Sequence, residues 1–68
     1  MALSARNKLS RRIEALKLGD IMAHVFVRVG DNLLESVITR TSADEMNLKV
    51  GDSVKIVVKS TEVMIEKD

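Results

Sequence analysis

The sequence contains no cysteine and only one histidine, His24, among its 68 residues. Without cysteine there can be no disulfide and no thiolate metal site, and one histidine cannot form the cluster that holds zinc. The length allows a single domain, which we assign to residues 1–68. A domain of this size buries only about 60% of the surface that its unfolded chain exposes. Since disulfides and metal clusters are excluded, we expect oligomerisation to supply the missing stability.

Long apolar runs are also missing. The longest apolar stretches, such as Val25-Phe26-Val27, are far too short to cross a bilayer. The N-terminus carries Leu3 but lacks the apolar segment of a secretory signal peptide. The composition is otherwise that of a folded protein, with 46% hydrophobic and 31% charged residues. We therefore expect a cytoplasmic protein that has no membrane partner.

The only aromatic residue is Phe26, which lies within an apolar run. Modules that bind single-stranded nucleic acid stack bases on several aromatic side chains, so this composition disfavours a nucleic-acid partner. A protein that contacts phosphate groups alone stays open. The net charge is only +1, yet residues 1–18 hold five basic side chains and one acidic side chain, Glu14. This basic stretch is either a solvated surface or a surface for an anionic partner.

Three Gly-Asp pairs divide the chain into four segments, at Gly19-Asp20, Gly30-Asp31 and Gly51-Asp52. Such pairs are typical of turns, because glycine adopts positive φ and aspartate bonds to its own backbone. Alternation of apolar and polar residues predicts four strands, at residues 21–29, 33–39, 53–59 and 62–66. The clearest is the strand at 21–29, whose apolar face comprises Ile21, Ala23, Val25, Val27 and Val29.

A short helix is predicted between the strands at 33–39 and 53–59. Ser42-Ala43-Asp44-Glu45 has the pattern of a capping box, with Ser42 as the N-cap and Glu45 three residues later. We expect one or two helical turns from Ser42 to about Leu48, since Gly51-Asp52 ends the segment.

Residues 9–18 have an ambiguous pattern. Leu9, Ile13 and Leu16 have helical spacing, whereas Ile13 and Ala15 alternate with polar residues as in a strand. Periodicity alone slightly favours a helix. A helix here would give an α+β fold, and a fifth strand would instead allow a small closed barrel.

Three short motifs carry a family resemblance. Ser4-Ala5-Arg6-Asn7-Lys8-Leu9 resembles the opening signature of the molbindins, the small molybdate-binding proteins also called Mop proteins. Ile38-Thr39-x-x-Ser42-Ala43 is similar to their second signature, and Lys59-Ser60-Thr61-Glu62-Val63-Met64 to their third. The order and the spacing of the three motifs match across essentially the whole chain.

The resemblance implies an all-β fold, namely a five-stranded barrel of the oligonucleotide/oligosaccharide-binding (OB) type. One short α-helix is expected between strands 3 and 4, and residues 9–18 become the first strand, against the periodicity. The resemblance also implies a homohexamer, built as a trimer of dimers, that holds oxyanions between its subunits. This agrees with the independent expectation that so small a domain needs partners.

By the same resemblance, the oxyanion-binding residues are Ser4, Arg6, Asn7, Thr39, Ser42, Lys59 and Ser60. Molybdate is a tetrahedral dianion whose oxygens only accept hydrogen bonds near neutral pH, so its site should offer donors. Arg6 offers a charged fork of N–H groups and Lys59 a compact ammonium. The hydroxyls can rotate to donate. Asn7 is expected to orient its loop or to donate a bond.

Several of these residues also have a purely structural interpretation. Ser42 could serve only as the N-cap of the helix, although the N–H groups of a helix start also favour an anion. Thr39 could be an ordinary strand residue, and Lys59 and Arg6 could be solvated. Their combination within the three motifs favours the ligand interpretation.

The sequence thus predicts a cytoplasmic protein that binds molybdate, or tungstate as its close mimic, for molybdenum storage or homeostasis. The molybdenum would be bound as the oxyanion, without direct metal ligands and without a catalytic cofactor. We expect no enzyme, because neither a Ser-His-Asp arrangement nor a Gly-rich phosphate loop is suggested by the spacing. Two alternatives stay open: an OB-type nucleic-acid-binding domain and a purely structural oligomerisation domain.

Overall fold

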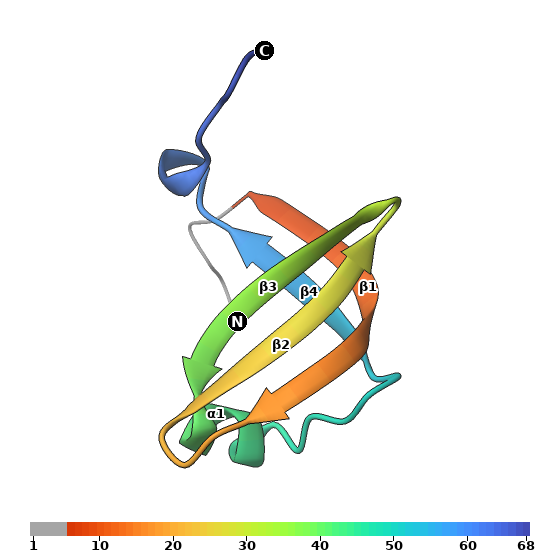
Figure 1. The fold of residues 1–68 in the computed structure, drawn as a ribbon, viewed down its shortest axis with the longest axis vertical. Helices are drawn as coiled ribbons and strands as arrows, with labels where there is room; N and C mark the ends of the chain where they lie inside the picture. The colour runs from red at the N-terminus through yellow and green to blue at the C-terminus, as the bar shows by residue number, and fades with distance from the viewer. Residues whose placement is uncertain (1–5) are drawn as a thin grey trace.

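The computed structural model describes residues 6–68, which form one antiparallel sheet of four strands in the order β3-β2-β1-β4 (Figure 1). A six-residue helix and a short 3-10 helix complete the structure. The elements in chain order are β1 (Asn7–Leu18), β2 (Met22–Val29), β3 (Asn32–Thr39), α1 (Arg40–Glu45), β4 (Ser53–Val58) and η1 (Ser60–Glu62). The all-β class and the helix between the third and fourth strands are confirmed.

Strand β1 resolves the ambiguity of residues 9–18. Its first half, up to Arg12, pairs with β4, and its second half, from Ile13, pairs with β2. A β-bulge between Ile13 and Ala15 marks the change of partner. Because a bulge inserts one extra residue, Ile13 and Leu16 both reach the core although they are three positions apart. The helical spacing seen in the sequence therefore comes from a bulged strand.

The core is small and centres on β2. Ile13, Val25 and Val27 form its buried cluster, and Ala23 is also buried, so the predicted apolar face of this strand is confirmed for Ala23, Val25 and Val27, whereas Val29 is only partly buried. Ile21 precedes β2 and is 78% exposed. The side chains that pack around the cluster are partly buried: Leu16, Ile38, Leu48, Val54 and Ile56. A core of this size gives a single chain little stability of its own.

The turns after β2 and β3 position the hairpin and the helix. Val29 pairs with Asn32 across a tight turn in which Gly30 has φ +60°, as the Gly-Asp signal predicts. The strands predicted at 21–29, 33–39 and 53–59 agree with β2, β3 and β4 to within one residue at each end.

The predicted helix start at Ser42 is wrong by three residues. The N-cap is Thr39, which keeps the extended conformation of β3 (φ −71°, ψ 150°) and accepts the N–H of Ser42 on its side chain. Ser42 is thus the third helical residue, and no Ser42–Glu45 capping box forms. The helix ends at Glu45, earlier than expected, because Asn47 adopts φ +51°. No helix within residues 6–68 is long and apolar enough to cross a membrane.

The five-stranded barrel is not found, and the strand expected at 62–66 is absent from residues 6–68. After β4 the chain forms η1, closed by a bond from the Glu62 N–H to the Lys59 carbonyl at 2.9 Å. Val63 is extended, but residues 63–68 join no ladder and lead away from the sheet (Figure 1). The sheet therefore stays open, with β3 and β4 as its two edges.

Candidate oxyanion site

The first and third motifs meet at one end of the sheet. Asn7 pairs with Val58 in the β1–β4 ladder. Arg6 precedes Asn7 and Lys59 follows Val58, so the antiparallel register makes these two cations neighbours across the ladder. Ser60 comes next, as the first residue of η1. We call Arg6, Asn7, Lys59 and Ser60 the cationic cluster.

Two members of the cationic cluster, Arg6 and Asn7, line an open hollow of about 650 Å³, whereas Lys59 and Ser60 are not part of its lining. Leu34 of β3 and Val63 of the tail are also among its lining residues. Within residues 6–68, none of the three ion pairs involves Arg6 or Lys59. Both charges are therefore available to an anion, since no carboxylate of the described chain neutralises them at contact distance.

The second motif forms a separate hydroxyl cluster, Thr39 and Ser42, at the start of α1. The Thr39 hydroxyl donates to Ser42 Oγ at 2.8 Å and accepts from the Ser42 backbone N–H at 3.1 Å. Because Ser42 Oγ accepts the Thr39 proton, its own proton is free to donate outward. The N-cap of the helix is therefore Thr39, and the side chain of Ser42 is not needed for capping.

Arg40, which the sequence analysis did not single out, is the cation beside the hydroxyl cluster. Its Nε donates to Asp44 Oδ1 at 3.0 Å, and its Nη1 donates to the Gly19 carbonyl at 3.0 Å. These bonds tie α1 to the turn between β1 and β2. Since Asp44 offsets its charge, Arg40 is a structural residue that orients the helix. An (i, i+4) Arg–Asp spacing was the signal that could have revealed it.

The two clusters lie at opposite ends of one chain. Thr39 pairs with Met22, next to the end of β1 at Leu18, whereas Asn7 is the first residue of β1. Figure 1 shows α1 at the lower end of the sheet and the start of β1 at the upper end. Six of the seven predicted ligands therefore fall into two separated groups. The seventh, Ser4, lies outside the described residues.

The outer face of the sheet carries charge pairs of a different kind. Arg28 donates two bonds of 3.0 Å to the carboxylate of Glu14. These hydrogen bonds lower the pKa of Glu14 and raise the pKa of Arg28. His24 pairs with Glu35, and no group of three metal-ligating side chains occurs within residues 6–68. These pairs stabilise the strands and stand apart from both clusters.

The chain is thus a small all-β domain with an open antiparallel sheet and one short helix. Hydrogen-bond donors suited to an anion lie at both ends of the sheet. The sequence profile of the TOBE domain family matches residues 3–65, and the chain belongs to that family. It is 41% identical over 66 residues to molybdenum-pterin-binding protein 1 of Clostridium pasteurianum, which covers 96% of this chain and 97% of that protein. The molbindin family predicted from the three motifs is thereby confirmed.

Solved structures agree with this assignment. A molybdate-binding protein from Sporomusa ovata superposes with a TM-score of 0.91 at 33% identity, over 98% of this chain and all of that one (100%). ModG, described as a cytoplasmic molybdate-binding protein, gives a TM-score of 0.80 at 38% identity. That match covers 88% of this chain and 43% of ModG. These relatives are named as binding proteins rather than as enzymes.

Proposed function

We propose that this protein binds molybdate, or tungstate, in the cytoplasm and serves molybdenum storage or homeostasis without catalysing a reaction. The observation that carries the proposal is the pair of donor clusters at opposite ends of the chain. Similarity to known proteins also supports the proposal, because relatives that match nearly the whole chain are named as molybdate-binding or molybdenum-pterin-binding proteins. The cytoplasmic location rests on the description of ModG.

The chemistry of the two clusters suits a dianion that carries no proton. Arg6 and Lys59 supply positive charge, and charged donors form hydrogen bonds roughly twice as strong as neutral ones. Ser42 and Ser60 supply hydroxyl protons, and the Asn7 amide supplies an N–H. A site built from donors favours an oxyanion that only accepts. Hydrogenphosphate, which carries a proton, gains less from such a site.

We place the oxyanion between subunits of a homo-oligomer. One chain cannot surround a small anion with both clusters, since the full length of β1 separates them. A second copy can bring its hydroxyl cluster to the cationic cluster of the first, and Ser4 belongs to the same proposed site by its motif. The hexamer implied by the molbindin resemblance would repeat this contact by symmetry. Binding would then favour the assembled form, because the anion bridges two chains.

Calorimetric titration with molybdate tests the function, with tungstate, sulfate and phosphate as comparison anions. We expect saturable binding of molybdate and tungstate and weaker binding of sulfate and phosphate. Arg6→Ala and Lys59→Ala should weaken molybdate binding. The matched controls are Arg11→Ala on β1 and Lys55→Ala on β4, both exposed and outside the clusters. Absence of molybdate binding by the folded wild-type protein would refute the proposal.

A further inference from the structure

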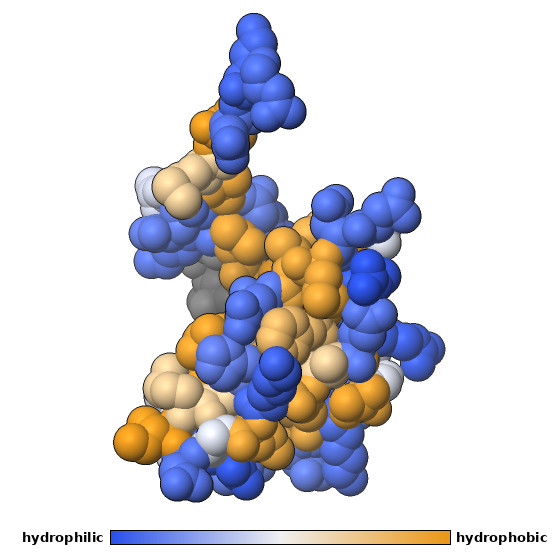
Figure 2. Space-filling view, viewed as in Figure 1, coloured by the Kyte–Doolittle hydropathy of each residue, from blue (hydrophilic) through white to orange (hydrophobic). Residues whose placement is uncertain are grey.

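The helix α1 lies at the surface of the molecule and has little apolar anchorage of its own. Figure 2 shows hydrophilic side chains among apolar ones at the lower end of the molecule, where Figure 1 places α1. Among residues 40–45, which form the helix, only Ala43 is buried. A helix of this length is not stable by itself in water, so its contacts with the rest of the chain decide its position.

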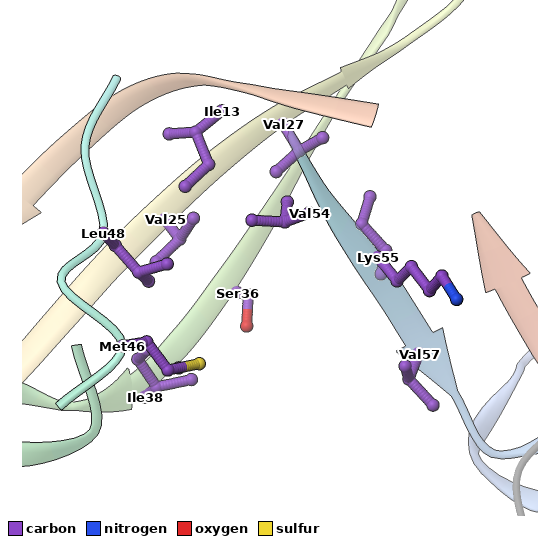
Figure 3. Close-up of a pocket in the computed structure, with 11 residues that line it drawn as sticks. Ile13, Val25, Val27, Ser36, Ile38, Met46, Leu48, Val54, Lys55 and Val57 are labelled. Atoms are coloured by element: carbon purple, nitrogen blue, oxygen red, sulfur yellow. The ribbon is translucent and has the colours of Figure 1, made fainter. Parts of the chain in front are cut away.

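The segment that follows α1 is held by apolar contacts. The side chains of Met46 and Leu48 line a cavity of about 190 Å³ with Ile38 of β3 (Figure 3). Leu48 also packs against the buried core cluster. These contacts hold the chain beyond the C-terminal end of α1. Neither Thr39 nor Ser42 lines this cavity, so the hydroxyl cluster at the other end of the helix needs a different support.

Polar bonds from Arg40 hold the N-terminal end of α1. The Arg40 backbone N–H donates to the Ile21 carbonyl at 2.7 Å, next to the ladder pair of Met22 and Thr39. The Arg40 side chain donates to the Gly19 carbonyl at 3.0 Å through Nη1. Both acceptors belong to the turn between β1 and β2, so this turn supports the first residue of the helix.

The turn between β1 and β2 has a tightly defined shape. The Gly19 N–H donates to the Met22 carbonyl at 2.9 Å, which closes the turn. A Cβ on Gly19 would lie 3.1 Å from that same oxygen, so a side chain at this position would displace one of the two groups. Glycine therefore allows the turn to close, and the closed turn presents the Gly19 carbonyl to the Arg40 guanidinium.

The Arg40 side chain also spans the helical turn that contains Ser42. Its Nε donates to Asp44 Oδ1 at 3.0 Å, so one planar guanidinium joins the β1–β2 turn to α1. Ser42 lies between Arg40 and Asp44 in the helix, and its Oγ accepts the Thr39 hydroxyl proton at 2.8 Å. A movement of this helical turn would therefore move the Ser42 hydroxyl as well.

The charge of Arg40 is already offset within the helix. Its Nε and Nη1 donate to Asp44 and to Gly19, and Asp44 is an ion-pair partner at 3.0 Å. An anion that approached the guanidinium would also meet the Asp44 carboxylate, which repels it. Arg40 is therefore better suited to hold other donors in place than to bind an anion itself.

We propose that Arg40 is a positioning residue of the oxyanion site. By joining the Gly19 carbonyl to Asp44, it holds the Ser42 hydroxyl where that hydroxyl can donate to the bound anion. Arg40 acts through Ser42 and does not touch the anion. This role rests on the proposed function, because it concerns the affinity of the hydroxyl cluster for molybdate. It extends the support of the site to the β1–β2 turn, which none of the three sequence motifs contains.

Calorimetric titration with molybdate tests the role of Arg40. Arg40→Met keeps an unbranched side chain without donors and should weaken molybdate binding by about tenfold, since loss of a supporting residue commonly costs that much. Arg40→Lys, which keeps one donor group, should recover part of the affinity. The matched control is Arg28→Met, because Arg28 also donates two bonds of 3.0 Å to a carboxylate, that of Glu14, but on the outer face of the sheet. Its affinity should equal that of the wild type.

A double-mutant cycle shows whether Arg40 acts through Ser42. Ser42→Ala removes the positioned hydroxyl, so Arg40→Met should weaken binding little further in that background. If the two losses of affinity multiply, Arg40 acts independently of Ser42 and the proposal is wrong. Equal affinities of Arg40→Met and the wild type would overturn it as well.

Amide hydrogen exchange without molybdate separates this inference from the proposed function. The Ser42 N–H is bonded to Thr39 Oγ1 at 3.1 Å, so its exchange rate reports how firmly the hydroxyl cluster is held. Arg40→Met should speed this exchange, whereas Arg28→Met should leave it unchanged. Unchanged exchange in Arg40→Met would overturn the positioning role even for a protein that binds molybdate. A wild type that does not bind molybdate would refute the proposed function and with it the role of Arg40 in binding, while the exchange rates would still report the support that Arg40 gives to Ser42.

Discussion

Thr39 and Ser42 share two hydrogen bonds across the junction of β3 and α1. The Thr39 hydroxyl donates to Ser42 Oγ at 2.8 Å, and the Ser42 backbone N–H donates back to Thr39 Oγ1 at 3.1 Å. The second bond caps the helix and the first orients the Ser42 hydroxyl. Thr39 therefore caps the helix and also orients the hydroxyl of Ser42, a candidate ligand. The sequence alone offers both the N-cap role and the ligand role to Ser42, and the structure gives the first of them to Thr39.

Thr39→Val should destabilise the protein by about 1 kcal/mol, because it removes the N-cap acceptor while keeping a β-branched side chain at the end of β3. The free energy of unfolding from urea denaturation, at fixed protein concentration and without molybdate, measures the loss. Thr39→Ser, which retains the hydroxyl, is the matched control and should lose much less. Equal stability of the two variants would show that the cap contributes nothing.

Ile13→Ala should lower the free energy of unfolding by roughly 2–5 kcal/mol, since Ile13 is 2% exposed and joins the two halves of β1 to the core. In a domain with so few buried side chains, that loss removes much of the total stability. Ile21→Ala, at a side chain that is 78% exposed, should change the stability by less than about 0.5 kcal/mol. Thermal and urea unfolding of both variants measure these two changes. Similar losses of stability for Ile13→Ala and Ile21→Ala would contradict the prediction.

The strands of the sheet could largely be predicted from the sequence, because alternation reports a half-buried strand wherever the register is regular. β1 could not be predicted in this way, since the bulge after Ile13 resets the alternation and imitates a helix. The predicted helix start at Ser42 is wrong because Thr39, at the end of a strand, is the N-cap of the helix. The capping-box pattern that begins at Ser42 looks stronger in the sequence but is not used. Local patterns do not show which of two neighbouring hydroxyls the backbone will use.

The remaining differences arise from contacts between distant segments. The strand pattern at 62–66 is present in the sequence, but a strand needs an edge to pair with, and the chain leaves its own sheet at η1. The motifs indicated the candidate ligand residues, and the ladder pair of Asn7 and Val58 brings the first and third motifs together. Their separation from Thr39 is a property of the fold, which no spacing along the chain reveals.

The pair of Glu14 and Arg28 should make a small, pH-dependent contribution to stability. The hydrogen bonds from Arg28 hold the pKa of Glu14 below its usual range. A folded-state pKa below the unfolded value stabilises the protein above the unfolded pKa of about 4.3, and this stabilisation is lost as the pH falls through the folded pKa. The effect should be slight, since the two side chains are 45% and 48% exposed.

Comparison of the wild type with Glu14→Gln measures this contribution. The urea midpoints should differ slightly at neutral pH and converge as the pH falls through the lowered folded-state pKa of Glu14, because the carboxyl then becomes protonated. Added salt should also reduce the difference at neutral pH, because exposed charges are screened. A difference that grows as the pH falls would have the wrong sign for a depressed carboxyl pKa.

Mixed oligomers can decide whether the oxyanion lies between chains. Arg6→Ala damages the cationic cluster, and Ser42→Ala damages the hydroxyl cluster. Suppose that each site combines the cationic cluster of one copy with the hydroxyl cluster of another. When the two variants are refolded together in equal amounts, about a quarter of the sites should then receive two undamaged clusters, because each cluster has an even chance of being intact. The restored fraction appears as high-affinity molybdate binding in calorimetry, which neither variant shows when it is refolded alone.

The control for this experiment mixes two variants of the same cluster, Arg6→Ala and Lys59→Ala. Every site then receives a cationic cluster from one damaged copy or the other, so mixing should restore nothing. Restoration in the first mixture and none in the second requires that the cationic and hydroxyl clusters of a site come from different chains. If neither mixture recovers binding although mass analysis shows that the subunits have mixed, then both clusters belong to one chain or one of them does not bind. In that case the interface site is wrong, even for a protein that binds molybdate.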